Sequence, residues 1–206
     1  MSGSDTRALS RSLLDLCRMR KLTIATAESC TGGLVAGALT DIPGSSDVID
    51  RGFVTYSNDA KRAMLGVKAS TLDSFGAVSK EIATAMAVGA LERAGTDLAV
   101  AITGIAGPGG ATPGKPVGLV HFAVAARDGR LIHRECRFGA IGRSSVRQRS
   151  VIEALRMLME LARGPKPPAK IRRESVSRLR RRTARVPLRR AGERRRTTGP
   201  RKPKKN

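Results

Sequence analysis

Asp97-Leu-Ala-Val-Ala-Ile-Thr103 is apolar at almost every position, which is the pattern of a β-strand buried on both faces of a sheet. A helix is predicted before it, from Ser79 to about Ala94, with Glu81 in the first turn and Gly95 at its end. Directly after the strand, residues 104–116 form a loop rich in Gly and Pro. Long loops of this type inside compact domains are usually functional or disordered.

The rest of the chain alternates in the same way. Towards the amino terminus we expect helices at 4–20, 34–40 and 57–65, and strands at 22–28 and 52–56. Towards the carboxy terminus, strands at 117–126 and 130–138 are joined by Asp128-Gly129, a strong hairpin signal, and a last helix covers 143–161. This order predicts an α/β fold, a three-layer sandwich with a mixed central sheet flanked by helices.

The net charge of +22 is concentrated at one end of the chain. Of the 39 Lys and Arg residues, 18 lie after Arg163, together with only 2 of the 17 acidic residues. This segment has few aliphatic residues and no aromatic ones, so it cannot bury enough apolar area to offset its ordering entropy. We therefore expect one domain at 1–163 and a basic, Pro- and Arg-rich disordered tail at 164–206.

Composition excludes several classes of protein. No apolar run approaches the roughly 18–20 residues needed to span a bilayer, and residues 1–20 lack the apolar block of a secretory signal. Three widely spaced cysteines suit a reducing cytosol better than a disulfide framework. His121 and His133 are isolated in the sequence and are given no role, so neither a metal site nor a cofactor is expected. These features predict a cytoplasmic protein.

Ser29, in Ala27-Glu-Ser-Cys-Thr-Gly-Gly33, is the first candidate for chemistry. It follows a predicted strand and precedes a helix, where backbone N–H groups lack partners and the helix dipole is positive. The two glycines let a ligand approach the backbone, so a nucleophile here would have oxyanion donors within reach. The commoner use of Ser29 and Thr31 at such a place is as N-caps. Cys30 is either a rival nucleophile or a small buried residue.

Tyr56-Ser-Asn-Asp-Ala-Lys61 holds the second candidate. A lysine acts as a general base only when burial or nearby positive charge lowers its pKa. Because neither Gly-containing segment has a histidine, a Ser–Lys pair helped by a tyrosine hydroxyl is favoured over a Ser-His-Asp arrangement. Taken alone, Lys61 fits a solvated surface lysine better, and Tyr56 a core aromatic with a wet end.

Two further features suit a phosphate. The loop at 104–116 could cradle one, although it lacks the Gly-Lys-Ser/Thr ending of a Walker motif. Arg143 and Arg147 lie one turn apart at the start of the last helix and face the same way. Two guanidinium groups beside a helix N-terminus suit a phosphate, but a solvated basic face is the commoner reason for such a pair.

Four segments, taken together and in order, closely resemble the CinA carboxy-terminal domain family, over roughly residues 10–161. They are Ala27-Glu-Ser-Cys-Thr-Gly-Gly33, Gly52-Phe-Val-Thr-Tyr-Ser-Asn58 with Lys61, Gly76-Ala-Val-Ser79 and Gly104-Ile-Ala-Gly-Pro108. Stand-alone members of the family are nicotinamide-nucleotide amidases, which hydrolyse the carboxamide of nicotinamide mononucleotide to nicotinate mononucleotide and ammonia. The resemblance implies this fold and this activity, without a cofactor.

The resemblance also implies a role for individual residues. Ser29 would be the nucleophile, Lys61 would take its proton and later deliver one to ammonia, and Tyr56 would relay or orient that proton. Backbone N–H groups of the turn would form the oxyanion hole. The residues expected to contact the substrate are Cys30, Thr31, Gly32, Gly33, Thr103, Gly104, Gly107, Arg143 and Arg147, the two arginines holding its phosphate. One departure is the family's Gly-Asp-Arg, which here is Gly139-Ala-Ile-Gly-Arg143.

Two alternatives to an amidase stay open. The domain could be a nucleotide-binding protein that has lost catalysis. The basic tail could give weak, salt-dependent, non-specific binding to nucleic acid, without the aromatic residues that stack on single strands, or it could be a solubilising extension. The family implies a homodimer. The nucleotide-processing domain of longer members is not in this sequence, so no pyrophosphatase activity is expected.

Overall fold

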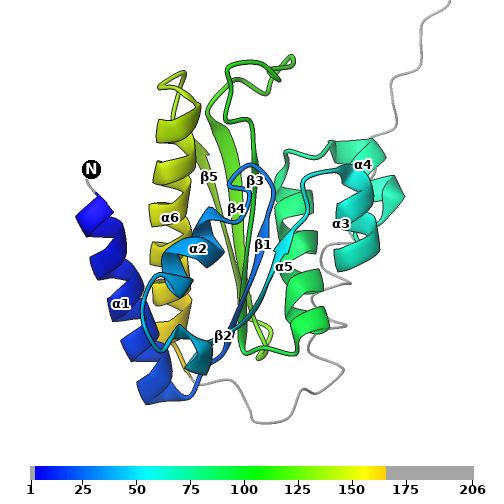
Figure 1. Cartoon of the computed structure of the whole chain (residues 1–206). Helices are drawn as coiled ribbons and strands as arrows, with labels where there is room; N and C mark the ends of the chain where they lie inside the picture. Colours follow the sequence, from blue (N-terminus) through cyan, green and yellow to red (C-terminus); the bar gives the residue numbers. More distant parts are fainter. Residues whose placement is uncertain (1–2, 166–206) are drawn as a thin grey trace, which may run out of the picture.

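The structure, a computed structural model, describes residues 3–165; the rest of the tail predicted for 164–206 lies outside the described residues. A five-stranded sheet lies between two layers of helices (Figure 1). The strands are β1 (Ile24–Glu28), β2 (Ile49–Val54), β3 (Leu98–Gly104), β4 (Leu119–Ala126) and β5 (Leu131–Arg137). The helices are α1 (Gly3–Arg20), α2 (Leu34–Thr40), α3 (Asn58–Leu65), α4 (Ala69–Phe75), α5 (Lys80–Ala94) and α6 (Arg143–Arg163), with a 3₁₀ turn η1 (Ser45–Asp47).

The sheet has the order β2-β1-β3-β4-β5, and it is mixed. β1 runs parallel to β2 and β3, whereas β3–β4 and β4–β5 are antiparallel, so the predicted three-layer α/β sandwich is confirmed. The chain leaves β1 towards β2 on one side and returns to β3 on the other. In open α/β sheets, ligands bind outside the carboxyl ends of the strands where the order reverses in this way. That point is the end of β1 beside β3, where the N–H of Ser29 donates to the carbonyl of Ile102 at 3.0 Å.

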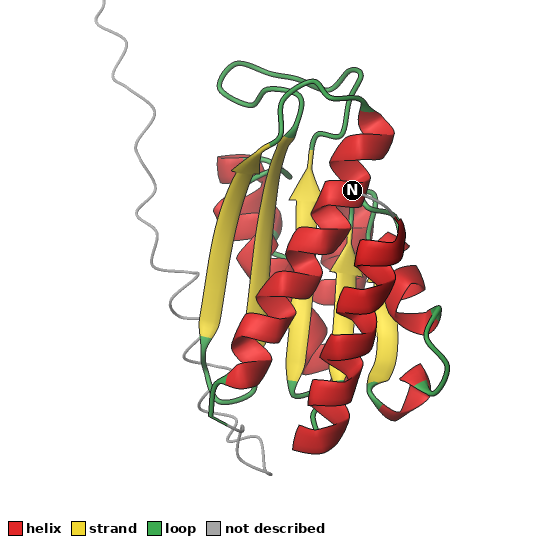
Figure 2. Cartoon of the chain, turned by 90° about the vertical axis from the view of Figure 1, so that its left-hand side faces the viewer, coloured by secondary structure: helices red, strands yellow, loops and turns green. Residues whose placement is uncertain are grey.

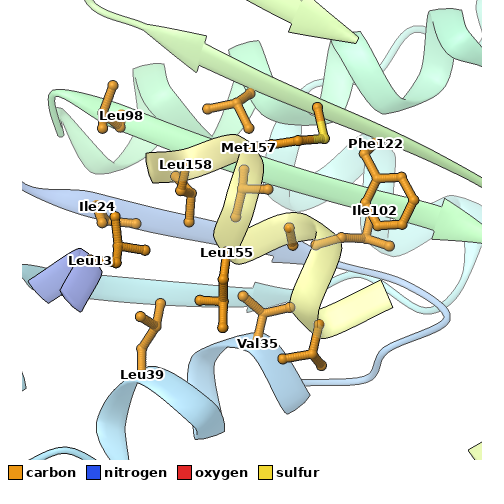
Figure 3. Packing of buried hydrophobic residues seen from close by; sticks show 14 of the residues in the cluster. Leu13, Ile24, Val35, Leu39, Leu98, Ile102, Phe122, Leu155, Met157 and Leu158 are labelled. Atoms are coloured by element: carbon orange, nitrogen blue, oxygen red, sulfur yellow. The ribbon is translucent and has the colours of Figure 1, made fainter. Parts of the chain in front are cut away.

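Each face of the sheet has its own core. On one face α1, α2 and α6 pack large aliphatic side chains against the sheet, and Figure 3 shows Leu13, Val35 and Leu155 among them. The other face is lined mainly by alanines. They are Ala25, Ala27, Ala99, Ala101, Ala123 and Ala125. Because these side chains are small, α5 can lie close to the strands, and burial of apolar area on both faces stabilises the sandwich.

Gly89 fixes how α5 meets α3. A Cβ atom at this position would lie 2.1 Å from the carbonyl oxygen of Leu65, the last residue of α3. No side chain fits there without moving one of the two helices. The glycine therefore allows α3, which carries Lys61, to pack directly on α5.

Two elements differ from the prediction. The strand expected at 52–56 is β2 (Ile49–Val54), and its exposed Asp50 and Arg51 give it the polar character of an edge strand. Helix α4 was not expected at all, because Leu72 is its one buried residue and its seven positions hold too little helical periodicity to recognise. The other helices and strands lie within two residues of their predicted limits, and Ser79 and Gly95 cap α5 as expected.

The two histidines are not isolated, which corrects the reading of the sequence. In the β4–β5 hairpin, His121 lies opposite Glu135 and His133 lies opposite Ala123, so the two rings are diagonal neighbours on one face. The Nδ1 atom of His121 is 3.1 Å from the Nε2 atom of His133. Burial lowers the pKa of both, that of His133 to about 4, with the neighbouring His121 as the next cause. The two histidines are 12 residues apart in the sequence, and only the register of β4 and β5 brings their rings into contact.

We expect this pair to make the protein less stable in mild acid. Since the folded-state pKa of His133 is below the unfolded value of about 6.5, the unfolded chain binds more protons between pH 6.5 and 4. The contribution of neutral His133 to the free energy of unfolding is therefore complete above pH 6.5 and is lost as the pH falls towards 4. The loss is on the order of 1 kcal/mol after allowance for partial exposure. Denaturant unfolding from pH 7 to 4 measures it, and His133→Gln should give a shallower slope; equal slopes would contradict the prediction.

The carboxyl end of α6 is fastened to the β4–β5 hairpin. Arg130 donates to the carbonyl oxygens of Leu161 at 3.0 Å and Pro165 at 2.7 Å. This hairpin lies at the opposite end of the sheet from the carboxyl ends of β1 and β3, where several loops gather (Figures 1 and 2).

None of the helices in residues 3–165 is long and apolar enough to cross a membrane.

Candidate active site

The structure brings Ser29 and Lys61 together at the predicted end of the sheet. Ser29 is the first residue after β1, and Lys61 lies in α3, whose start is capped by the Ser57 hydroxyl. The Nζ atom of Lys61 is 3.2 Å from the Oγ atom of Ser29. Lys61 is only 1 % exposed, so its interpretation as a solvated surface lysine is wrong.

The Lys61 amine is enclosed by backbone carbonyl oxygens and shielded from solvent. Nζ donates to the carbonyl oxygen of Thr55 at 2.9 Å and lies 3.4 Å from those of Tyr56 and Ser57. Burial lowers the pKa of Lys61, because the ammonium ion loses its hydration in the protein interior. Nζ also donates to the Ser29 Oγ, and in its neutral form the amine has a lone pair that can accept the serine proton instead. This geometry can deprotonate the serine.

The start of α2 is capped by Glu28, a residue that the sequence analysis missed. The N-cap position is Gly33 with φ of 97°, and neither Ser29 nor Thr31 caps the helix with its side chain, so the N-cap interpretation of both residues is wrong. The fully buried Glu28 carboxylate accepts hydrogen bonds from the N–H groups of Gly33, Val35 and Ala36. The signal available in the sequence was an acidic residue at the end of the predicted strand, followed by a short Gly-containing turn before a helix whose own N-cap position is a glycine.

These contacts narrow the candidate oxyanion hole. The N–H of Gly32 donates to the carbonyl of Ser29 at 3.0 Å, and that of Gly33 donates to Glu28. The backbone N–H groups at the start of α2 are therefore not all unpartnered, as the sequence had suggested. Within residues 3–165, the backbone N–H groups of Cys30 and Thr31 donate neither to the Ser29 carbonyl nor to the Glu28 carboxylate.

Cys30 has the properties of a buried structural cysteine. It is 6 % exposed, and burial raises the pKa of its thiol to about 12. Since the thiolate is the reactive form of cysteine, Cys30 is a poor nucleophile next to Ser29. The sequence analysis left this choice open, and the environment of the thiol favours the serine.

Tyr56 lies at the rim of the site and is not a core aromatic, which corrects that alternative. Its side chain is 61 % exposed, and its hydroxyl accepts a hydrogen bond from Nη2 of Arg143 at 2.9 Å. Nη1 of the same arginine donates to the carbonyl of Gly107 at 3.1 Å. Among the described residues, the hydroxyl makes no hydrogen bond to Ser29 or Lys61. Arg143 thus joins the loop after β2 to the Gly-rich loop after β3.

The remaining predicted residues hold the loops around Ser29. Nη2 of Arg147 donates to the carbonyl of Thr31 at 2.8 Å, and its buried Nε atom has no partner in the described part of the chain. The Thr103 hydroxyl donates to the carbonyl of Ala77 at 2.7 Å. A Cβ on Gly104 would lie 2.8 Å from the carbonyl oxygen of Leu119, so glycine is needed where the loop leaves β3.

A groove on the described surface lies away from Ser29, although the predicted substrate contact Gly33 lines it. Within residues 3–165, no three His, Cys, Asp or Glu side chains come close enough together to hold a metal ion. An open groove of about 600 Å³ runs between α1, α2 and α6, and none of Ser29, Tyr56 and Lys61 lines it. The chemistry-bearing groups therefore gather at the carboxyl ends of β1 and β3.

Comparison with known proteins identifies the family. The model of the CinA C-terminal domain matches residues 6–162. The chain belongs to the CinA C-terminal domain family. The resemblance seen in the sequence is thus confirmed, and so is the fold that it implied.

Relatives of two lengths carry this CinA domain. The chain is 48 % identical over 161 residues to nicotinamide-nucleotide amidohydrolase PncC of Escherichia coli K12, which covers 78 % of this chain and 96 % of that protein. A CinA-like protein of Chlorobium phaeovibrioides is 57 % identical over 121 residues, 59 % of this chain and 28 % of the relative. The chain spans about a third of the length of such longer relatives.

Solved structures of the family have the same architecture. Competence/damage inducible protein CihA from Agrobacterium tumefaciens is 57 % identical and superposes with a TM-score of 0.75, covering 76 % of this chain and 95 % of that one. Competence damage-inducible protein A (ComA) from Klebsiella pneumoniae gives a TM-score of 0.74 at 37 % identity, covering 78 % of this chain and 99 % of that one.

Proposed function

We propose that this protein is a nicotinamide-nucleotide amidase, which hydrolyses the carboxamide of nicotinamide mononucleotide to nicotinate mononucleotide and ammonia. The observation that carries the proposal is the buried Lys61 amine 3.2 Å from the Ser29 hydroxyl, at the point where the strand order reverses. Similarity to the E. coli amidohydrolase over 96 % of its length supports the choice of substrate.

The reaction follows from these two side chains. Neutral Lys61 takes the Ser29 proton while Oγ attacks the carboxamide carbon, and the N–H groups of Cys30 and Thr31 bind the oxyanion. Lys61 then protonates the leaving nitrogen, ammonia departs, and the acyl group stays on Ser29 as an ester. Lys61 next takes a proton from water, whose oxygen attacks the ester, and it returns that proton to Oγ as the ester bond breaks, which releases the acid and restores Ser29 and the neutral amine.

The nucleotide is proposed to lie across the rim of the site. Arg143 and Arg147 each retain guanidinium N–H groups beyond those given to Tyr56, Gly107 and Thr31. These groups would bind the phosphate as forked donors. Tyr56 would orient the substrate through its hydrogen bond to Arg143, rather than relay the serine proton.

Incubating the purified protein with nicotinamide mononucleotide tests the proposal. We expect ammonia and nicotinate mononucleotide in equal amounts, at the same rate with and without EDTA, because the proposed steps use only side chains and water. Coupled ammonia detection and chromatography of the nucleotides measure both products. Binding of the mononucleotide by calorimetry without turnover would contradict the proposal and favour the nucleotide-binding alternative.

A further inference from the structure

We propose that Glu28 is a positioning residue, whose carboxylate closes the turn that carries Ser29 and so holds Oγ in place for attack. The inference rests on the proposed role of Ser29 as nucleophile. Glu28 is the last residue of β1 and directly precedes Ser29, and its side chain is fully buried. A buried carboxylate is costly unless hydrogen bonds compensate its charge, so its partners show what it does.

Those partners are the backbone donors at the start of α2. Oε2 accepts from the N–H groups of Gly33 and Val35, both at 3.0 Å, and Oε1 accepts from that of Ala36 at 2.8 Å. The Thr26 hydroxyl is 3.3 Å from Oε1. Gly33 at the N-cap has no side chain to satisfy these donors. Glu28 supplies the cap from the preceding strand, and the positive end of the helix offsets its charge.

This arrangement makes a closed loop around Ser29. At one end, the carbonyl of Glu28 accepts from the N–H of Thr55 at 2.8 Å, and Ser29 donates to Ile102. At the other end, Gly33 is tied to the carboxylate of the same Glu28. The length of one side chain therefore sets the path of the residues between them. Lys61 lies on α3 and reaches the Glu28 backbone through Thr55, so the distance from Oγ to Nζ depends on how the Glu28 side chain closes the turn.

The carboxylate also distinguishes between neighbouring groups of the turn. By accepting from the N–H groups of Gly33, Val35 and Ala36, it holds the start of α2 against the turn that carries the nucleophile. Its negative charge adds to burial in raising the pKa of the Cys30 thiol to about 12, which keeps that thiol protonated. Both effects favour attack by the serine.

The test compares Glu28→Gln and Glu28→Asp with the wild type. Glutamine can accept with one oxygen only, and its amide N–H groups face backbone donors, whereas aspartate is one methylene shorter. We expect kcat per folded molecule to fall about 10- to 100-fold in both, while KM changes less than about threefold because Glu28 does not contact the substrate.

Asp97→Asn is the matched control. The Asp97 carboxylate accepts from the N–H and hydroxyl of Thr23 at 2.9 and 3.0 Å, at the far end of the same sheet. The Asp97→Asn substitution should lower the melting temperature without changing kcat. If Glu28→Gln and Glu28→Asp lost stability and kept the wild-type kcat, Glu28 would be a structural cap only, and the inference would be wrong.

A second readout separates this inference from the proposed function. Fluorophosphonate labelling of Ser29, followed by intact mass, reports the reactivity of Oγ without any nucleotide. We expect slower labelling in both Glu28 variants and the wild-type rate in Asp97→Asn. Labelling without ammonia release in the wild type would refute the amidase and leave Glu28 testable. If the wild type showed no labelling and no turnover, Ser29 would be excluded as the nucleophile, and the inference about Glu28 would fall with it. If Glu28→Gln does not fold, the labelling rate of Glu28→Asp decides the question. Labelling of Glu28→Asp at the wild-type rate would overturn the positioning role of Glu28.

Discussion

Ser29→Ala is expected to abolish ammonia release, lowering kcat by about 10⁴- to 10⁶-fold. The reason is that in the proposed mechanism Oγ supplies the bond to the substrate carbon, and the neighbouring Cys30 thiol, which is buried with a pKa of about 12, is a poor substitute. The loss of one hydroxyl should leave the fold unchanged. Ammonia release and the thermal unfolding midpoint, measured on the same preparation, separate lost chemistry from lost structure.

Cys30→Ala is the matched control for that experiment. It removes the adjacent side chain, which also lies in the turn, without touching Oγ. If Cys30→Ala were inactive while Ser29→Ala kept its activity, the nucleophile would be the cysteine. If both kept activity, neither side chain would form the covalent intermediate.

Lys61→Met should lower kcat by about 10²- to 10⁴-fold, the usual contribution of a general base. Methionine nearly preserves the length and volume of the buried side chain but has no proton to exchange. Lys68→Met is the control, because Lys68 is an exposed lysine seven residues later, at the start of α4. Equal activity of the Lys61→Met protein and the wild type would exclude Lys61 as the base.

The wild-type pH profile tests the same residue. Because burial lowers the pKa of Lys61 and the neutral amine is the active form, kcat/KM should rise with pH and level off below the ordinary lysine value of about 10.4. The half-maximal point marks the shifted pKa. A profile that rose only near pH 10.4 would show that burial does not activate the amine.

The sequence predicted the layers of the fold well, because the signals for them are local. The apolar run of β3, the Asp128-Gly129 turn and the caps of α5 each determine a structure within a few residues. The edge strand β2 and the short α4 were predicted less well, since the former is partly exposed and the latter buries one leucine.

The sequence identified most of the residues of the candidate site, but it did not show which of them contact one another. The pairing of Ser29 with Lys61 depends on α3 folding back over the end of β1, which is a property of the whole chain. Glu28 was missed because its capping contacts run from a strand to a helix across a turn, outside the usual N-cap position. His121 and His133 were missed as a pair because only the register of β4 and β5 brings them together.

The attachment of α6 to the β4–β5 hairpin has a practical consequence. Arg130 holds Leu161 and Pro165 at the end of the molecule opposite Ser29. A linker that follows Pro165 therefore starts far from the mouth of the site. Anchoring the domain to a bead or an electrode through such a linker should turn the loops around Ser29 outward, so that the proposed substrate can reach them from solution.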